Sequence, residues 1–133
     1  MTESELEVCW QLKKSIRDKN DEMQRLREVL THLTHELSDM PRAQILESRI
    51  AAITSRVLTL EEEIGELRKK LREAQIELTT QLCTTAISTP EFSVIHRRYV
   101  KCMRFRDIGF ELNYSDATVF RLHKTGLRKL LKS

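Results

Sequence analysis

Apolar residues recur with a helical period over most of the chain. From Leu46 to Leu78 they follow alternating steps of four and three residues, the a/d pattern of helices packed along a seam, sustained for over four heptads. The pattern predicts a long helix with one packed face. The central seam residues are Ile50, Ile53, Val57, Leu60, Ile64, Leu67 and Leu71.

The preceding residues repeat this rhythm from Cys9 to Met40, with Lys19 as a polar intrusion in the seam. Such a residue sets the register of the pairing, or lays its stem along the seam with its amine in water. Between the two helical segments, Pro41 ends one helix and fits the first turn of the next. Because the arms are nearly equal, we expect an antiparallel helical hairpin over residues 1–83, with its turn at about 38–43.

Within the hairpin, each helix packs its seam against the other helix. Further apolar residues lie beside the seam, and this pairing does not cover them. A second hairpin packed against the first would cover them, so we expect a homodimer. These flanking residues are Leu6, Trp10, Val29, Ile45, Leu58 and Ile76.

The pattern changes after residue 83. Residues 84–89, TTAIST, are small, polar or β-branched and precede Pro90, which predicts a linker. Residues 90–133 then divide into three short helices, the first beginning at Pro90. The predicted fold class is therefore all-α, with a hairpin followed by a small three-helix domain.

The last two of these short helices have the spacing of a helix-turn-helix. Gly109 supplies the small residue that a steep helix crossing needs, Asn113 tolerates a left-handed turn, and Ser115 is a good N-cap. Apolar residues fall at the offsets of the crossing. They are Ile108, Leu112, Tyr114, Val119 and Leu122.

Charge is distributed unevenly between these two parts. Residues 90–133 carry ten Lys or Arg and four acids, a net of +6, whereas the other 89 residues carry 13 basic and 16 acidic side chains. A basic module beside a mildly acidic scaffold favours a polyanion as the partner of the C-terminal part.

The segment RYVKCMRFRDIGFELNYSDATVFRLHKTGLRKL resembles the part of sigma factors that reads the −35 promoter element. It is more similar to the sigma-like helix-turn-helix proteins of phages and prophages, relatives of the ArpU and RinA late-transcription regulators. Phe105 and Arg106 stand where those proteins usually begin this helix with Trp or Ser followed by two Glu, so this segment is more basic. Nothing in the chain resembles the sigma region that binds the −10 element.

The resemblance implies a sequence-specific transcription regulator whose last helix enters the major groove of double-stranded DNA. Its outward residues are the expected base readers, namely Asp116, Ala117, Thr118, Arg121 and Lys124. A second set is expected to contact the DNA backbone, namely Arg97, Arg98, Lys101, Arg104, Arg106, Ser115 and Arg128.

The residues give less support to catalysis, metal binding or disulfide bonding. No phosphate loop or nucleophile motif occurs, so we expect no enzyme and no cofactor. His32, His35 and Glu36 are too few for a zinc site, and we expect no metal. Cys9, Cys83 and Cys102 form no disulfide pattern, and packing is the expected role of Cys9 and Cys83. No signal peptide or membrane span is predicted, so we expect a cytoplasmic protein. The resemblance to phage and prophage proteins implies that the cell is a bacterial host.

The length of the hairpin, far more than a DNA reader needs, keeps a second function open. In this alternative, the chain is a phage-encoded interaction or inhibitor protein. The hairpin would bind a host or mobile-element protein, such as RNA polymerase, a repressor or a defence nuclease.

Overall fold

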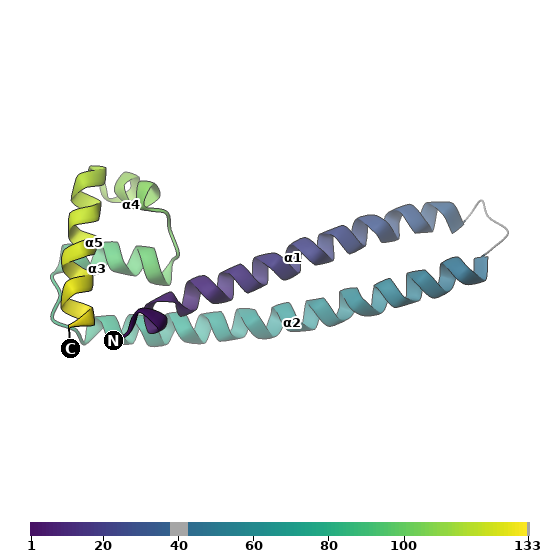
Figure 1. Ribbon diagram of the computed structural model, residues 1–133, viewed down its shortest axis with the longest axis horizontal. Coiled ribbons are helices and arrows are strands. Elements are labelled where there is room, and N and C mark those ends of the chain that lie inside the picture. The colour runs from purple at the N-terminus through teal and green to yellow at the C-terminus, as the bar shows by residue number, and fades with distance from the viewer. Residues whose placement is uncertain (38–42, 133) are drawn as a thin grey trace. The chain divides into compact units, whose positions relative to one another are not determined.

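The computed structural model describes residues 1–37 and 43–132, and all regular structure in these ranges is helical (Figure 1). The prediction of an all-α chain with a long N-terminal helix pair is confirmed. The predicted turn at 38–43 lies outside the described residues apart from Ala43. The elements are α1 (Glu3–Leu37), α2 (Ala43–Cys83), α3 (Thr89–Ile95), the π-helical turn η1 (His96–Val100), α4 (Phe105–Leu112) and α5 (Asp116–Leu131).

Contacts group the chain into two compact units, Met1–Lys13 with Lys70–Ser133, and Lys14–Lys69. The sequence-predicted boundary at residues 84–89 falls inside the first unit, between the end of α2 at Cys83 and the start of α3 at Thr89. Within the described residues, no helix has a stretch both long and apolar enough to cross a lipid bilayer.

The Lys14–Lys69 unit is an antiparallel pair formed by the distal parts of α1 and α2 (Figure 1). Of the predicted seam residues in this unit, Val57, Leu60 and Ile64 are buried. The others, Ile50, Ile53 and Leu67, are half-buried. Leu71, in the other unit, packs at the edge of that unit's core.

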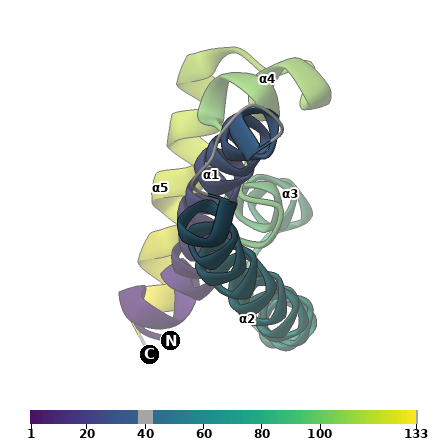
Figure 2. The same cartoon turned by 90° about the vertical axis from the view of Figure 1, so that its right-hand side faces the viewer.

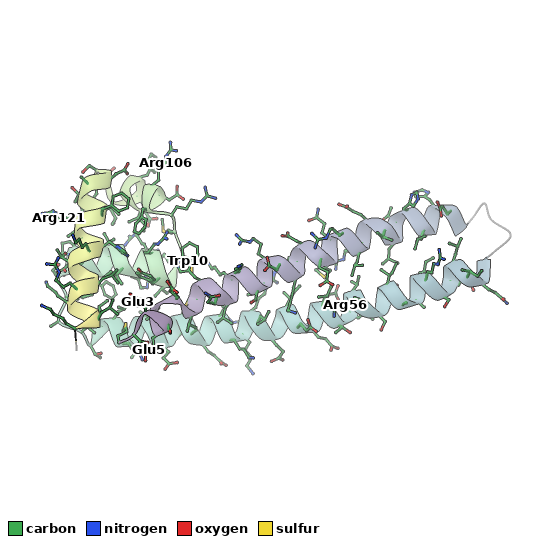
Figure 3. The ribbon with its side chains drawn as sticks, viewed as in Figure 1. Glu3, Glu5, Trp10, Arg56, Arg106 and Arg121 are labelled. Atoms are coloured by element: carbon green, nitrogen blue, oxygen red, sulfur yellow. The ribbon has the colours of Figure 1, made fainter. Side chains whose placement is uncertain are left out.

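Ion pairs flank the seam in the pattern that antiparallel helices require. Arg56 on α2, labelled in Figure 3, contacts Glu22 on α1 at 3.1 Å, and each of the two residues comes directly before an a position of its helix. Arg27 on α1 contacts Glu61 on α2 at 2.6 Å, and both follow a d position. Like flanking positions meet only when the two helices run in opposite directions, so these pairs are consistent with the hairpin register.

Lys19 extends from its seam position to an acid on the other helix of the hairpin. Its stem is half-buried and its Nζ lies 2.6 Å from Glu63 Oε2. This contact lowers the pKa of Glu63, chiefly through the hydrogen bond from Lys19.

Replacing Lys19 with leucine is expected to raise the thermal midpoint by about 4 °C, because an apolar side chain in the seam stabilises more than a partly exposed ion pair. Thermal unfolding followed by circular dichroism measures this. Lys14→Leu, which places the same side chain at an exposed position on α1, is the matched control and should leave the midpoint unchanged. An equal rise in both variants would show that the seam position is not special.

A capping box starts α3. Ser88 Oγ accepts from the backbone N–H of Glu91, and Glu91 Oε1 accepts from the N–H of Ser88. The helix therefore begins at Thr89, one residue before the predicted start at Pro90. Glu91 is 3% exposed and also accepts from Lys129 Nζ on α5 at 2.7 Å, so one carboxylate caps α3 and ties it to α5.

The core of the first unit includes the beginning of α1. Leu6 and Cys9 are buried together with residues of α2, α3, η1 and α5. Trp10 donates its indole N–H to the carbonyl of Arg98 at 2.8 Å. The assignment of Leu6 and Trp10 to a second hairpin was wrong, because the C-terminal helices of the same chain cover them. Val29, Ile45, Leu58 and Ile76 are exposed in the single chain, and their burial by a second hairpin stays a prediction.

The cysteines differ in their surroundings. Cys9 is buried, as predicted, and burial raises its pKa to about 11. Cys83 is exposed at the last residue of α2, so the prediction that it packs was wrong. Cys102 follows η1 with a φ of 56°, a left-handed conformation that is uncommon for a residue with a side chain.

Candidate nucleic-acid interface

A small apolar cluster joins α4 to the N-terminal half of α5. Val94, Ile108 and Val119 are fully buried in it, and the flanking apolar residues include Leu112, Tyr114 and Leu122. All five residues predicted to meet at the helix crossing therefore belong to one cluster. Figures 1 and 2 both show α4 lying beside the N-terminal end of α5.

Gly109 lies where α4 comes close to the backbone of the turn that follows this helix. A Cβ at this position would be 2.9 Å from the carbonyl oxygen of Tyr114 and 3.4 Å from Cγ2 of Val119. The first neighbour is backbone and cannot rotate away, so the position requires glycine. The predicted need for a small residue is confirmed.

The turn after α4 has the predicted chemistry. Asn113 adopts a left-handed conformation with φ 57° and ψ 40°, ending α4. Ser115 is the N-cap of α5, and its Oγ accepts from the backbone N–H of Thr118 at 3.3 Å. These two residues fix the direction in which α5 leaves the turn.

One face of α5 carries unpaired positive charge. Val119, Gly126 and Leu130 are buried on the inner face. The opposite face carries Ala117, Arg121, Lys124 and Arg128, all exposed and each about one helical turn after the one before it. None of the three cations forms an ion pair within the described residues, and Arg121 points away from the rest of the helix in Figure 3.

The other two expected base readers lie beside this face. Asp116 is exposed in the first turn of α5. Thr118 is half-buried, and its hydroxyl lies 3.0 Å from Ser115 Oγ. The Thr118 hydroxyl is therefore already hydrogen-bonded to the N-cap residue. The sequence had suggested instead an outward side chain with a free hydroxyl.

Three of the expected backbone contacts are exposed cations near the start of α4. Lys101 and Arg104 precede the helix and Arg106 lies in its first turn. Arg106 projects outward in Figure 3. Their side chains have no acidic partner within the described residues, so they are available to an anion.

Arg97 and Arg98 are instead engaged within the chain. Arg97 pairs with Glu111 at 3.0 Å and donates to the carbonyl of Ser93. The guanidinium of Arg98 lies between the rings of Trp10 and Phe105, at 4.7 and 4.1 Å from their centroids. It also donates to a backbone carbonyl. We therefore assign both side chains to holding the domain together rather than to phosphate contact.

A cluster of Tyr99, Phe105 and His123, which was not predicted from the sequence, supports the same region. Tyr99 Oη lies 2.7 Å from His123 Nε2, and Phe105 meets the ring of His123 edge-on. Burial lowers the pKa of His123, with a smaller effect from Arg98, and burial raises the pKa of Tyr99. The ring of Phe120 packs on Phe105 but stays half exposed, so it joins the cluster only at its edge.

The histidines on α1 form no candidate metal centre. His32 Nε2 lies 3.0 Å from Glu36 on the same helix. Within residues 1–37 and 43–132, no group of three or more potential ligands gathers at one place.

No protein-family model, curated protein or solved structure significantly matches this chain.

Proposed function

We propose that the chain is a sequence-specific DNA-binding transcription regulator, with α4 and α5 as a helix-turn-helix and α5 entering the major groove. One observation carries this proposal. Arg121, Lys124 and Arg128 lie unpaired along a single face of α5, and the glycine crossing, left-handed turn and serine cap hold that helix at its N-terminal end. The resemblance to phage and prophage sigma-like regulators supports the same assignment.

The proposed contacts follow from position and side-chain chemistry. Arg121, one turn into α5, reaches a guanine edge through its two-pronged guanidinium, and Ala117 is short enough to meet a thymine methyl group. Lys124 and Arg128, further along the same face, contact phosphates, as do Lys101, Arg104 and Arg106 near α4. The protein supplies these contacts without a cofactor.

Replacing Arg121 with alanine is expected to weaken binding to the selected DNA site by about 2 kcal/mol, roughly thirtyfold, because a bidentate base contact is lost.

Arg106→Ala is expected to weaken binding to all sequences alike and to lower the salt slope by about one. The site is first obtained by selection from a random DNA pool with the full-length protein. Fluorescence anisotropy at several salt concentrations then measures both variants.

The matched control is Arg25→Ala, which removes an exposed arginine from α1 and should change neither affinity nor salt slope. Selection that enriches no sequence, together with affinity independent of salt, would refute the proposal.

A second function is favoured by the exposed apolar side chains of the hairpin, such as Val29, which is 44% exposed. In this alternative, the hairpin binds a host or mobile-element protein and the basic helix is secondary. The full-length Arg121→Ala, Lys124→Ala double variant separates the two functions. The measurement is the effect that producing the protein has on its cell, compared between wild type and the double variant. Loss of that effect in the variant supports DNA reading, whereas an unchanged effect supports protein binding through the hairpin.

A further inference from the structure

The carbonyl groups at the end of η1 are held by side chains from both long helices. Trp10 on α1 donates its indole N–H to the carbonyl of Arg98 at 2.8 Å. Gln75 Nε2 on α2 donates to the carbonyl of Val100 at 3.0 Å, and Lys13 Nζ on α1 donates to the carbonyl of the following residue at 3.1 Å. Carbonyls at the end of a helix need partners from outside that helix. Here three side chains of the first unit supply those partners.

The segment that follows η1 is tied to this turn. It comprises residues 101–104 and includes Cys102 in its left-handed conformation. The backbone N–H of Met103 donates to the carbonyl of Arg97 at 2.9 Å, and the carbonyl of Met103 accepts from the guanidinium of Arg98 at 3.0 Å. A displacement of η1 therefore moves residues 101–104 as well.

The first turn of α4 lacks the serine cap that the helices on either side of it have. Ser88 caps α3 and Ser115 caps α5, whereas Arg104, at the N-cap position of α4, makes no side-chain cap among the described residues. The position of this first turn therefore depends on residues 101–104 and on the packing of α4 against α5. These residues and the first turn carry the exposed cations Lys101, Arg104 and Arg106.

We propose that Trp10, Lys13 and Gln75 are positioning residues for DNA binding, because by holding the end of η1 they fix where Arg104 and Arg106 meet the phosphates. This inference rests on the proposed function and extends it. It gives the adjoining parts of α1 and α2 a role in binding that acts through the backbone of η1. Gln75 offers the most direct test, since Trp10 also contacts a guanidinium and Lys13 carries a charge that itself attracts DNA.

The test is Gln75→Met in the full-length protein. Methionine keeps the length and the unbranched shape of the side chain but has no amide donor, so the carbonyl of Val100 loses its partner. The affinity for the selected DNA site is expected to fall about fivefold and the salt slope by about one, the value of one lost phosphate contact. Fluorescence anisotropy at several salt concentrations measures both.

The salt slope separates positioning from stability. A variant that is merely less stable has a smaller active fraction, which lowers the apparent affinity and leaves the slope unchanged. Circular dichroism at the temperature of the binding assay checks that the variant is folded. Gln11→Met makes the same change at an exposed position of α1 in the same unit. This matched control should alter neither the affinity nor the slope.

Amide hydrogen exchange without DNA is the second readout. The backbone N–H of Met103, which donates to the carbonyl of Arg97, should lose protection in Gln75→Met and keep it in Gln11→Met. Unchanged protection of Met103 in Gln75→Met overturns the inference, because Gln75 would then not hold this segment. Lost protection with wild-type affinity and salt slope also overturns it, because the segment would then not position the phosphate contacts.

Failure of the proposed function gives a different result. A wild-type protein that selects no DNA sequence and binds without salt dependence refutes the proposed function, and the positioning role falls with it. A wild-type protein that selects DNA, with the Gln75→Met variant equal to it in salt slope, refutes the positioning role alone.

Discussion

Replacing Trp10 with alanine is expected to lower the free energy of unfolding by about 3 kcal/mol, although Trp10 lies far along the sequence from the helices it supports. The substitution removes the hydrogen bond from the indole to the carbonyl of Arg98 and the ring that stacks on its guanidinium. The value is at the low end for tryptophan because the ring is only half-buried.

Chemical denaturation measures the total effect, and amide hydrogen exchange locates it. Protection is expected to fall in α3, α4 and α5, because Arg98 also stacks on Phe105 at the start of α4. The matched variant Trp10→Phe keeps an aromatic face and loses the hydrogen bond, so its cost should be about 1 kcal/mol. Unchanged exchange in α4 and α5 of the alanine variant would show that α1 does not stabilise the C-terminal helices.

Replacing Glu91 with alanine is expected to cost about 3 kcal/mol at pH 7. The carboxylate caps α3 and accepts from Lys129 on α5, and both contributions disappear together. Glu91→Gln keeps the shape and loses the charge, so it should fall between the wild type and the alanine variant. The control is Glu111→Ala, which breaks an exposed ion pair with Arg97 and should cost less than about 1 kcal/mol.

The contribution of Glu91 also depends on pH. Its hydrogen bond from Lys129, followed by that from Ser88, lowers its pKa from 4.5 to about 2 in the folded protein. The unfolded chain therefore takes up the proton first as the pH falls. The stabilisation is fully present above about pH 5 and is lost between about pH 4.5 and pH 2. Denaturation at pH 7 and pH 3 should show the difference between wild type and Glu91→Gln shrinking at the lower pH, and a constant difference would contradict the assignment.

Local chemistry explains which parts of the structure the sequence could predict. Gly109, Asn113 and Ser115 each act on backbone within a few residues, so their roles follow from residue type and spacing alone. The seam of the hairpin is predictable for a related reason. A heptad repeat specifies a packed face whatever lies elsewhere in the chain.

Contacts between distant segments could not be predicted in this way. In the sequence, Trp10 and Leu6 are apolar residues beyond those that the coiled-coil seam needs. Only the folded chain shows that α3, η1 and α5 cover that part of α1. Arg97 and Arg98 read as two more cations in a basic segment. Their partners, Glu111, Trp10 and Phe105, are fixed by the tertiary arrangement.

The inclusion of residues 1–13 in the same compact unit as the C-terminal helices has a consequence for biosynthesis. Trp10 leaves the ribosome 88 residues before its partner Arg98, so the first unit cannot close until the end of α5 has been translated. The Lys14–Lys69 pair needs no later residue and is free to form during elongation. The nascent chain therefore holds the side chains of Leu6, Cys9 and Trp10 uncovered through most of its synthesis, an interval in which general chaperones have a segment to bind.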